Sequence, residues 1–261
     1  MAKSGQARVL SQSQQAHLFN AITDHRHPEK NTAIMQISFK LGLRAQEIAL
    51  LQIKEVAQLH PVSRNAPARF KLYEVMSLPA AYTKGADALN RSTSKYTQKT
   101  VSFSVFDFDR IIRDVARLAN AGLAVDPKSF YPEIKTHRGV SRDLPMVDKA
   151  LRQALENYLE VRLEKEPGAT PSSPLFLSQK GFAYSPNTLQ EHMGLMLRTW
   201  ASIEKASSHS GRRSVVTHII HTQGKSVKTA QKILGHKNAS TTILYEEPPE
   251  DQLADALRNI T

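Results

Sequence analysis

Cysteine is absent from this 261-residue chain, and its absence excludes disulfides and thiolate metal sites. The sequence also lacks any apolar run close to the roughly 20 residues that a membrane-crossing helix needs. Its first 15 residues are polar and have no apolar centre of the kind found in signal peptides. We therefore expect a soluble cytoplasmic protein that has no membrane partner.

Positive charge is what the chain has in excess. The formal net charge is +11, while 40% of the residues are hydrophobic, so the chain can bury a core and still present a basic surface. Residues 246–261 hold five acids and one arginine, which leaves +15 on the rest. Such a surface indicates a polyanionic partner such as DNA.

The most informative pattern is the order of polar residues in the last fifth of the chain. It runs His209-Ser210-Gly211-Arg212, then Leu234-Gly235-His236, then Tyr245 nine residues further on. A tyrosine phenolate can act as a nucleophile, and arginines and histidines can stabilise charge on a phosphate. Arginine can hold two phosphate oxygens with its planar fork. The set indicates phosphodiester cleavage without a metal, a nucleotide or another cofactor.

A second arginine motif lies far upstream, where Gly42-Leu43-Arg44 is followed by Glu47. Glu47 lies one helical turn after Arg44 and is expected to steady it. Each string alone is common, but together, in this order, with Arg212 24 residues before His236, they resemble the tyrosine recombinase or phage integrase family. The resemblance implies a mainly α fold with a small antiparallel β-sheet (α+β). It also implies a site-specific recombinase that integrates, excises or inverts a DNA element.

The resemblance assigns a role to each of these side chains. Arg44 and Arg212 would clamp the scissile phosphate, and His209 and His236 would hydrogen-bond its oxygens. Tyr245 would attack phosphorus in line, leaving a 3′-phosphotyrosyl enzyme and a free 5′-hydroxyl. His209 is also the expected acceptor of the phenol proton.

The family also carries a catalytic lysine on a β-hairpin, and this chain offers two candidates. Lys135 begins a string that continues through a polar turn to Arg142 and Pro145, which resembles the hairpin and its return strand. Lys135 is therefore the expected general acid for the leaving 5′-oxygen. Lys84, which is followed by Gly85, is the alternative, because the family often has Lys-Gly at this turn.

Residues 60–130 exceed what the family pattern needs and predict an insertion. A Ser/Thr/Lys-rich run at 83–100 predicts a basic loop, and apolar residues at helical spacing from Phe106 to Leu118 predict a helix behind it. The insertion either packs on the catalytic domain or contacts the DNA backbone with basic side chains. The candidates for backbone contacts are Lys84, Arg91, Lys95 and Lys99.

Apolar spacing and capping residues predict further helices. These are expected at residues 11–22, from 31 towards 41, at 147–164, at 186–200 and, as a tail that packs in cis or on a neighbouring subunit, within 250–261. His218 and His221 lie three residues apart without an acid at ligand spacing, so we interpret them as helix-face residues and expect no metal site.

The front of the chain is short, because only 43 residues precede Arg44. It therefore resembles a catalytic domain without a separate N-terminal core-binding domain, similar in layout to small inversion recombinases. The resemblance implies double-stranded DNA as partner, a homotetramer on two DNA sites, and a monomer or dimer off DNA. An accessory DNA-bending protein and a location at the nucleoid fit the same reading.

Two other functions share the fold or the chemistry. One is a catalytically silent DNA-binding accessory or regulatory protein, which the filled catalytic positions argue against. The other is a type IB topoisomerase-like enzyme, against which the spacing from Leu-Gly-His to Tyr245 argues.

Overall fold

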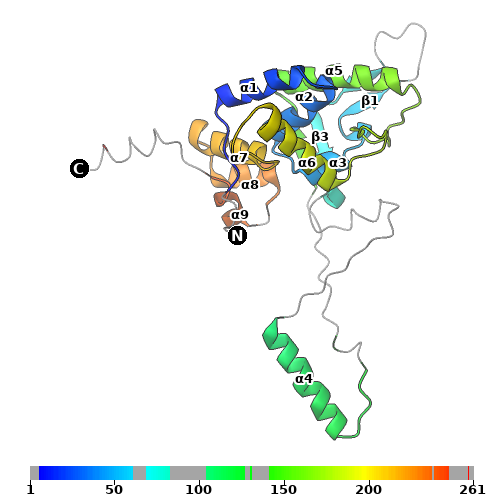
Figure 1. The fold of residues 1–261 in the computed structure, drawn as a ribbon, viewed down its shortest axis with the longest axis vertical. Coiled ribbons are helices and arrows are strands. Elements are labelled where there is room, and N and C mark those ends of the chain that lie inside the picture. Colours follow the sequence, from blue (N-terminus) through cyan, green and yellow to red (C-terminus); the bar gives the residue numbers. More distant parts are fainter. Residues whose placement is uncertain are drawn as a thin grey trace. The chain divides into compact units, whose positions relative to one another are not determined.

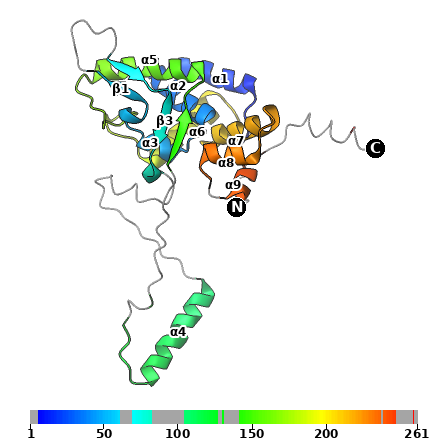
Figure 2. The same cartoon turned by 180° about the vertical axis from the view of Figure 1, so that it is seen from behind.

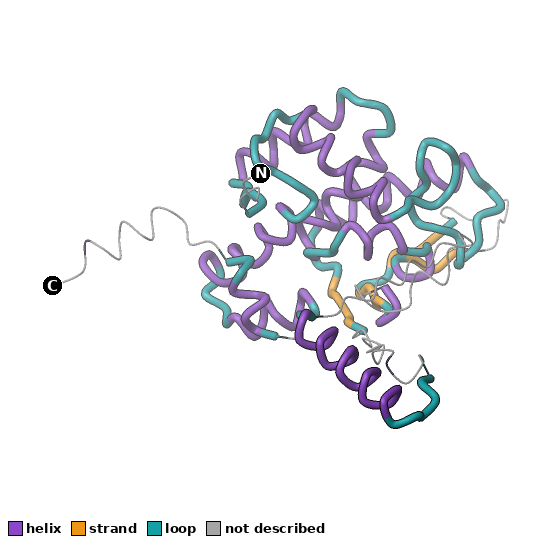
Figure 3. The backbone as a smooth tube through the Cα atoms, turned by 60° about the horizontal axis from the view of Figure 1, so that its bottom comes forward, coloured by secondary structure: helices purple, strands orange, loops and turns teal. Residues whose placement is uncertain are grey.

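The computed structural model describes residues 6–60, 69–82, 104–126, 130, 141–236, 238–246 and 258. The chain forms two compact units, one of residues 1–84 and 139–261 and the other of residues 85–138. Helices dominate the first unit, and its strands are few and short (Figure 3). This confirms the predicted mainly α fold with a small antiparallel β component.

The helices of the first unit cover most of its described length (Figure 1). They are α1 (Gln12–Thr23), α2 (Pro28–Gln36), α3 (Ala45–Leu50), α5 (Lys149–Lys165), α6 (Pro186–Leu195), α7 (Ser210–Thr217), α8 (Val227–Leu234) and α9 (Ala239–Ile243). Single π turns extend three of them: η1 (Ile37–Leu41) follows α2, η6 (Met196–Trp200) follows α6 and η7 (His218–Thr222) follows α7. Short 3₁₀ turns lie at η2 (Ile53–Glu55) and η3 (Ala80–Tyr82).

Local signals in the sequence explain where several helices begin. Ser11 and Gln14 form a reciprocal capping box at the start of α1, and Asp148 and Ser185 accept hydrogen bonds from the first turns of α5 and α6. Pro186 occupies the first position of α6, where its missing N–H is not needed. The helices predicted at residues 11–22, 147–164 and 186–200 are thereby confirmed.

The core lies between two pairs of helices. Helix α2 packs on α5, with α1 beside them, and α3 packs on α6 (Figures 1 and 2). Ile34, Ile48, Leu155 and Leu189 are fully buried at these contacts. Side chains of this size each contribute about 1.5–3 kcal/mol when they leave water. None of the helices in the described part of the chain is both long and apolar enough to cross a membrane.

Two small antiparallel sheets flank this core. Strand β1 (Ala57–Leu59) pairs with β2 (Phe70–Leu72), and β3 (Val75–Leu78) pairs with β4 (Arg142–Pro145) so that Leu78 lies opposite Arg142. Strand β4 is the predicted return strand, but its observed partner is β3, which lies within residues 60–130, the stretch predicted to be an insertion. The first part of that stretch therefore belongs to the first unit, and only residues 85–138 form a separate one. Lys135 and Lys84, the two candidates for the hairpin lysine, lie outside the described residues.

The second unit contains α4 (Val105–Asn120), which confirms the helix predicted from Phe106 to Leu118. Ser104 caps it by accepting a hydrogen bond from the backbone N–H of Asp107. No residue of α4 is buried, and the apolar side chains of Val105 and Phe106 are exposed. The apolar spacing therefore predicted the helix correctly, although its apolar side chains are not buried. Arg91, Lys95 and Lys99 lie outside the described residues, as does the predicted tail helix apart from Arg258.

Gly211 allows α7 to approach η1 closely. A Cβ built on Gly211 would lie 2.3 Å from the Oγ of Ser38 and 2.9 Å from its backbone carbonyl. Such a clash involves main chain, so a rotamer change alone cannot relieve it. This packing explains why a glycine precedes Arg212.

We predict that Gly211→Ala lowers the free energy of unfolding by about 1–3 kcal/mol, because overpacking outweighs the gain of about 1 kcal/mol in helix propensity. Urea unfolding followed by circular dichroism measures this. Gly168→Ala is the matched control, since nothing lies within 4 Å of its Cβ position. Equal stability of the two variants would contradict the packing argument.

Candidate active site

The site is organised around the carboxylate of Glu47, which is completely buried. Arg44 is the N-terminal cap residue of α3, and its backbone N–H donates to Oε2 of Glu47 over 2.8 Å. Its guanidinium donates to Oε1 over 3.2 Å. Glu47 thus contacts Arg44 through both the backbone and the side chain.

Two further arginines reach the same carboxylate. Nη2 of Arg142, on β4, lies 2.6 Å from Oε1 of Glu47, and Nη1 of Arg212, on α7, lies 3.9 Å from Oε2. One negative charge thus lies among three positive ones, with Arg142 and Arg212 almost wholly buried. The cluster keeps a surplus of positive charge, which suits it to binding an anion.

Arg212 is fixed by main-chain carbonyls as well as by Glu47. Its guanidinium donates to the carbonyl oxygens of Gly42, just after η1, and of Leu234, at the end of α8. Burial, followed by the charge of Arg44, lowers the pKa of Arg212 to about 9. The side chain is thus positively charged at neutral pH and held in one orientation.

His236 is delivered by the end of α8. Gly235 ends the helix with a φ of 63°, a conformation that strongly favours glycine. The imidazole Nδ1 then lies 2.9 Å from Oγ1 of Thr242, while Nε2 is buried and has no hydrogen-bond partner among the described residues. In the tautomer in which the Thr242 hydroxyl donates to Nδ1, the ring proton lies on Nε2 and can be donated.

The surroundings keep His236 uncharged. Burial is the main cause that lowers its pKa, to about 3, and the charges of Arg212 and Arg44 act in the same direction. The imidazole is therefore neutral at physiological pH. It can act as a hydrogen-bond donor through Nε2 but adds no further charge to the arginine cluster.

Tyr245 follows α9 and faces these groups. Its ring centroid lies 5.2 Å from that of His236 and 6.4 Å from that of His209, and Cζ of Arg212 lies 5.7 Å from it. Five predicted residues, Arg44, His209, Arg212, His236 and Tyr245, thus meet in one place although they come from distant parts of the chain. Glu47, also predicted, lies at the centre of the cluster, and the other predicted site residues lie outside the described residues: Lys84, Arg91, Lys95, Lys99 and Lys135.

Sequence reasoning missed a contact that holds the tyrosine segment. Nε2 of His221, on η7, lies 3.1 Å from Oε1 of Glu246, the residue after Tyr245. The helix-face interpretation fits His218, which is exposed, but is incomplete for His221, whose side chain keeps only 14% exposure. Together with Thr242 on His236, this contact anchors the segment on both sides of the tyrosine. Within the described ranges, no three His, Asp or Glu side chains are grouped to hold a metal ion.

Arg142 is a second residue whose role the sequence did not reveal. It was expected only as the first residue of a return strand. Its Nη1 donates to the carbonyl oxygen of Ile233 over 2.9 Å, so this one side chain joins β4, α8 and Glu47. Burial is the main cause that lowers its pKa. The strand after the insertion is thereby fixed to the arginine cluster.

We predict that Glu47→Gln lowers the free energy of unfolding by about 3–5 kcal/mol, because it leaves three clustered arginines without a counter-charge. Urea unfolding measures the change. Glu160→Gln, at an exposed position on α5, is the control and should be near neutral. A loss below about 0.5 kcal/mol in Glu47→Gln would show that the carboxylate does not organise the cluster.

We predict that His221→Ala increases amide hydrogen exchange over residues 239–246, because it removes one anchor of the tyrosine segment. His218→Ala, at the exposed position on the same π turn, should leave that exchange unchanged. Mass spectrometry of peptides from both variants makes the comparison. Identical exchange in the two variants would contradict the anchor.

Comparisons with known proteins agree with this geometry. The model of the phage integrase family matches residues 112–251. The chain is 32% identical over 149 residues to tyrosine recombinase XerD of Corynebacterium glutamicum, covering 55% of this chain and 47% of that protein. It is 30% identical over 109 residues to tyrosine recombinase XerC of Halalkalibacterium halodurans, covering 42% and 36%. The matches span less than half the length of either relative.

Solved structures show a similar fold. The crystal structure of XerA recombinase has a TM-score of 0.58 at 17% identity and covers 97% of this chain and 65% of that one. The XerH site-specific recombinase, bound to a palindromic difH substrate, has the same TM-score at 16% identity, with coverages of 98% and 54%. Because the family model matches more than half of the sequence, the chain belongs to the phage integrase family of tyrosine recombinases.

Proposed function

We propose that this protein is a site-specific DNA recombinase that cleaves and rejoins DNA through a 3′-phosphotyrosyl intermediate on Tyr245. The observation that carries the proposal is the position of Tyr245 beside Arg212 and His236, at a buried cluster with surplus positive charge. A DNA phosphate is an anion that such a cluster would stabilise. The XerH structure, in which a protein of this fold holds a DNA substrate, supports the same reading.

The chemistry follows from the charges around the tyrosine. Arg44 and Arg212 bind the non-bridging oxygens, and His236 donates from Nε2 to one of them. The Oη of Tyr245 attacks phosphorus while its proton passes to His209. A bond forms between phosphorus and Oη, and the bond to the 5′-oxygen breaks. The energy of the broken bond is kept in the phosphotyrosine, so a 5′-hydroxyl can reverse the step without ATP.

The leaving 5′-oxygen needs a proton, and we assign its donation to Lys135, with Lys84 as the alternative. Lys84 shortly follows β3 and Lys135 shortly precedes β4, so the pairing of these strands supports either lysine as part of the hairpin region. Arg142 ties β4 to Glu47, which supports a position of this hairpin near the phosphate site. We also propose that the working form is a homotetramer that holds two DNA sites.

We predict that the wild-type chain forms a covalent adduct with a nicked suicide duplex taken from DNA flanking its gene, and that Tyr245→Phe forms none, because phenylalanine has no nucleophilic oxygen. Denaturing gels detect the adduct. Tyr73→Phe, at a partly exposed tyrosine outside the site, should keep it. Specific DNA binding without any adduct would point instead to an accessory protein, and efficient relaxation of plasmids lacking a specific site would point to a topoisomerase.

The two lysines can be separated with a sulfur leaving group. We predict that Lys135→Ala cleaves a normal duplex about 10²–10⁴-fold more slowly, because the alkoxide leaves without its proton donor. A duplex with a 5′-bridging sulfur should restore the rate, since a thiolate leaves unprotonated. Lys84→Ala should behave like wild type on both substrates. The reverse pattern would assign the proton to Lys84.

A further inference from the structure

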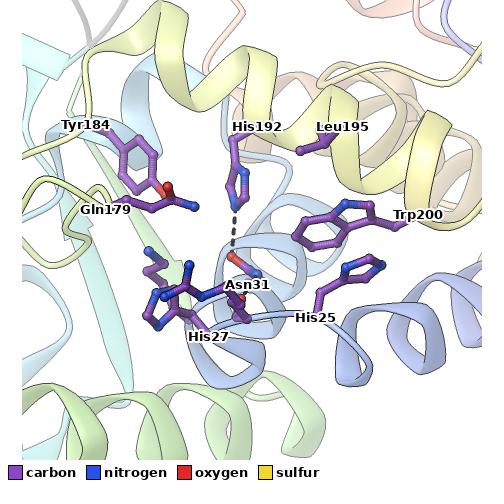
Figure 4. Close-up of a pocket in the computed structure, with 10 residues that line it drawn as sticks. His25, His27, Asn31, Gln179, Tyr184, His192, Leu195 and Trp200 are labelled. Atoms are coloured by element: carbon purple, nitrogen blue, oxygen red, sulfur yellow. Dashed lines mark hydrogen bonds between the residues drawn. The ribbon is translucent and has the colours of Figure 1, made fainter.

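A pocket of about 160 Å³ lies between the loop that precedes α2 and the helix formed by α6 and η6 (Figure 4). Ten residues line it, and none of them is Asp or Glu. None of the residues of the candidate active site belongs to it. The pocket is thus a separate feature of the first unit.

Lys30 gives this pocket a buried positive charge. Its side chain keeps only 8% of its exposure, and its ammonium donates to the carbonyl of Leu177 over 2.9 Å and lies 5.4 Å from the ring centroid of Tyr184. In the described part of the chain no carboxylate forms an ion pair with it, and Lys165 adds a second positive charge nearby. A buried charge without a counter-charge is unfavourable, so an anion in the pocket would stabilise the protein.

Arg26 adds a second cation to the same space, together with two histidines whose pKa values are lowered. Arg26 and His27 line the pocket beside Lys30. Figure 4 shows His192 across from Asn31, with its Nε2 hydrogen-bonded to the side-chain oxygen of Asn31 over 2.9 Å. Burial and then the charge of Lys30 lower the pKa of His192 to about 4. Glu29 lies near His27 but does not line the pocket. The positive potential is therefore not neutralised by the pocket's own residues.

Aromatic rings form two sides of the pocket. Figure 4 shows Tyr184 on one side and Trp200 on the other, with His192 between them. Trp200 stacks on His25 with centroids 3.9 Å apart, and His192 meets its ring edge-on at 5.6 Å. A ligand in this space would meet cations at its anionic end and apolar ring surface beside it.

We propose that this pocket binds a phosphate group, carried either by a small phosphorylated ligand such as a mononucleotide or by the DNA backbone. A phosphate offers enough oxygens for both the Arg26 guanidinium and the Lys30 ammonium, whereas a single arginine fork satisfies a carboxylate. The rings of Tyr184 and Trp200 would contact the remainder of the ligand, such as the base or sugar of a mononucleotide. The proposal goes beyond recombination, and only its DNA form rests on the proposed function.

Trp200 provides a direct test because it is the only tryptophan in the chain. Its fluorescence is titrated with sodium phosphate and with adenosine monophosphate, at an ionic strength held constant with sodium chloride. The wild type should show a saturable change, as should Lys54→Gln, the control at an exposed lysine outside the pocket. Lys30→Gln should bind at least tenfold more weakly while keeping its circular dichroism spectrum.

Arg26→Gln is the second variant, and because Arg26 is exposed it should fold even if Lys30→Gln does not. It should weaken binding at least threefold. The absence of a saturable response, or unchanged affinity in both variants, would overturn the proposal.

A second titration identifies the carrier of the phosphate. If duplex DNA abolishes the response to adenosine monophosphate, and Lys30→Gln weakens DNA binding, the phosphate belongs to the DNA backbone. If adenosine monophosphate binds the DNA complex as tightly as the free protein, the site serves a small ligand. Tyr245→Phe, whose changed residue does not line the pocket, should keep the wild-type response to phosphate, so failure of the Tyr245 reaction and failure of this pocket are separate outcomes.

Discussion

The buried carboxylate of Glu47 is the interaction on which the rest of the site depends. It contacts Arg44 within its own helix, Arg142 on a strand beyond the insertion and Arg212 on α7. A buried negative charge is tolerated only when it is well paired, and three arginines satisfy it. Because the pairing is unequal, the cluster retains positive charge where Tyr245 lies, and a phosphate is the group that this charge would stabilise.

Main-chain positions give the cluster its rigidity. Arg212 is held by the carbonyls of Gly42 and Leu234, and the absence of a side chain on Gly211 lets its helix pack on η1. The guanidinium is therefore fixed before any substrate arrives. Preorganised charge of this kind is worth more than mobile surface charge, because no reorganisation is needed when negative charge develops on a bound group.

The tyrosine segment is held in a different way from the arginines. Helix α9 is only five residues long, and Ile243 and Leu244 beside Tyr245 are exposed. Its anchors are two side-chain contacts, Thr242 with His236 and Glu246 with His221. The proposed nucleophile thus lies on a short, lightly packed element beside a rigid set of cations, an arrangement in which the tyrosine can be released without disturbing the core.

The sequence by itself determined the helices with clear caps and apolar spacing, such as α1, α4 and α5. The order of its motifs also identified the candidate site residues Arg44, Arg212, His236 and Tyr245. These signals are local, since a helix repeats its apolar positions within a few residues. Tertiary structure alone decided that β4 pairs with β3 across the second unit, that Arg142 joins Glu47, and that Lys30 is buried without an acid. Such contacts join residues far apart in the chain, and long-range pairing leaves no periodic trace in the sequence from which it could be predicted.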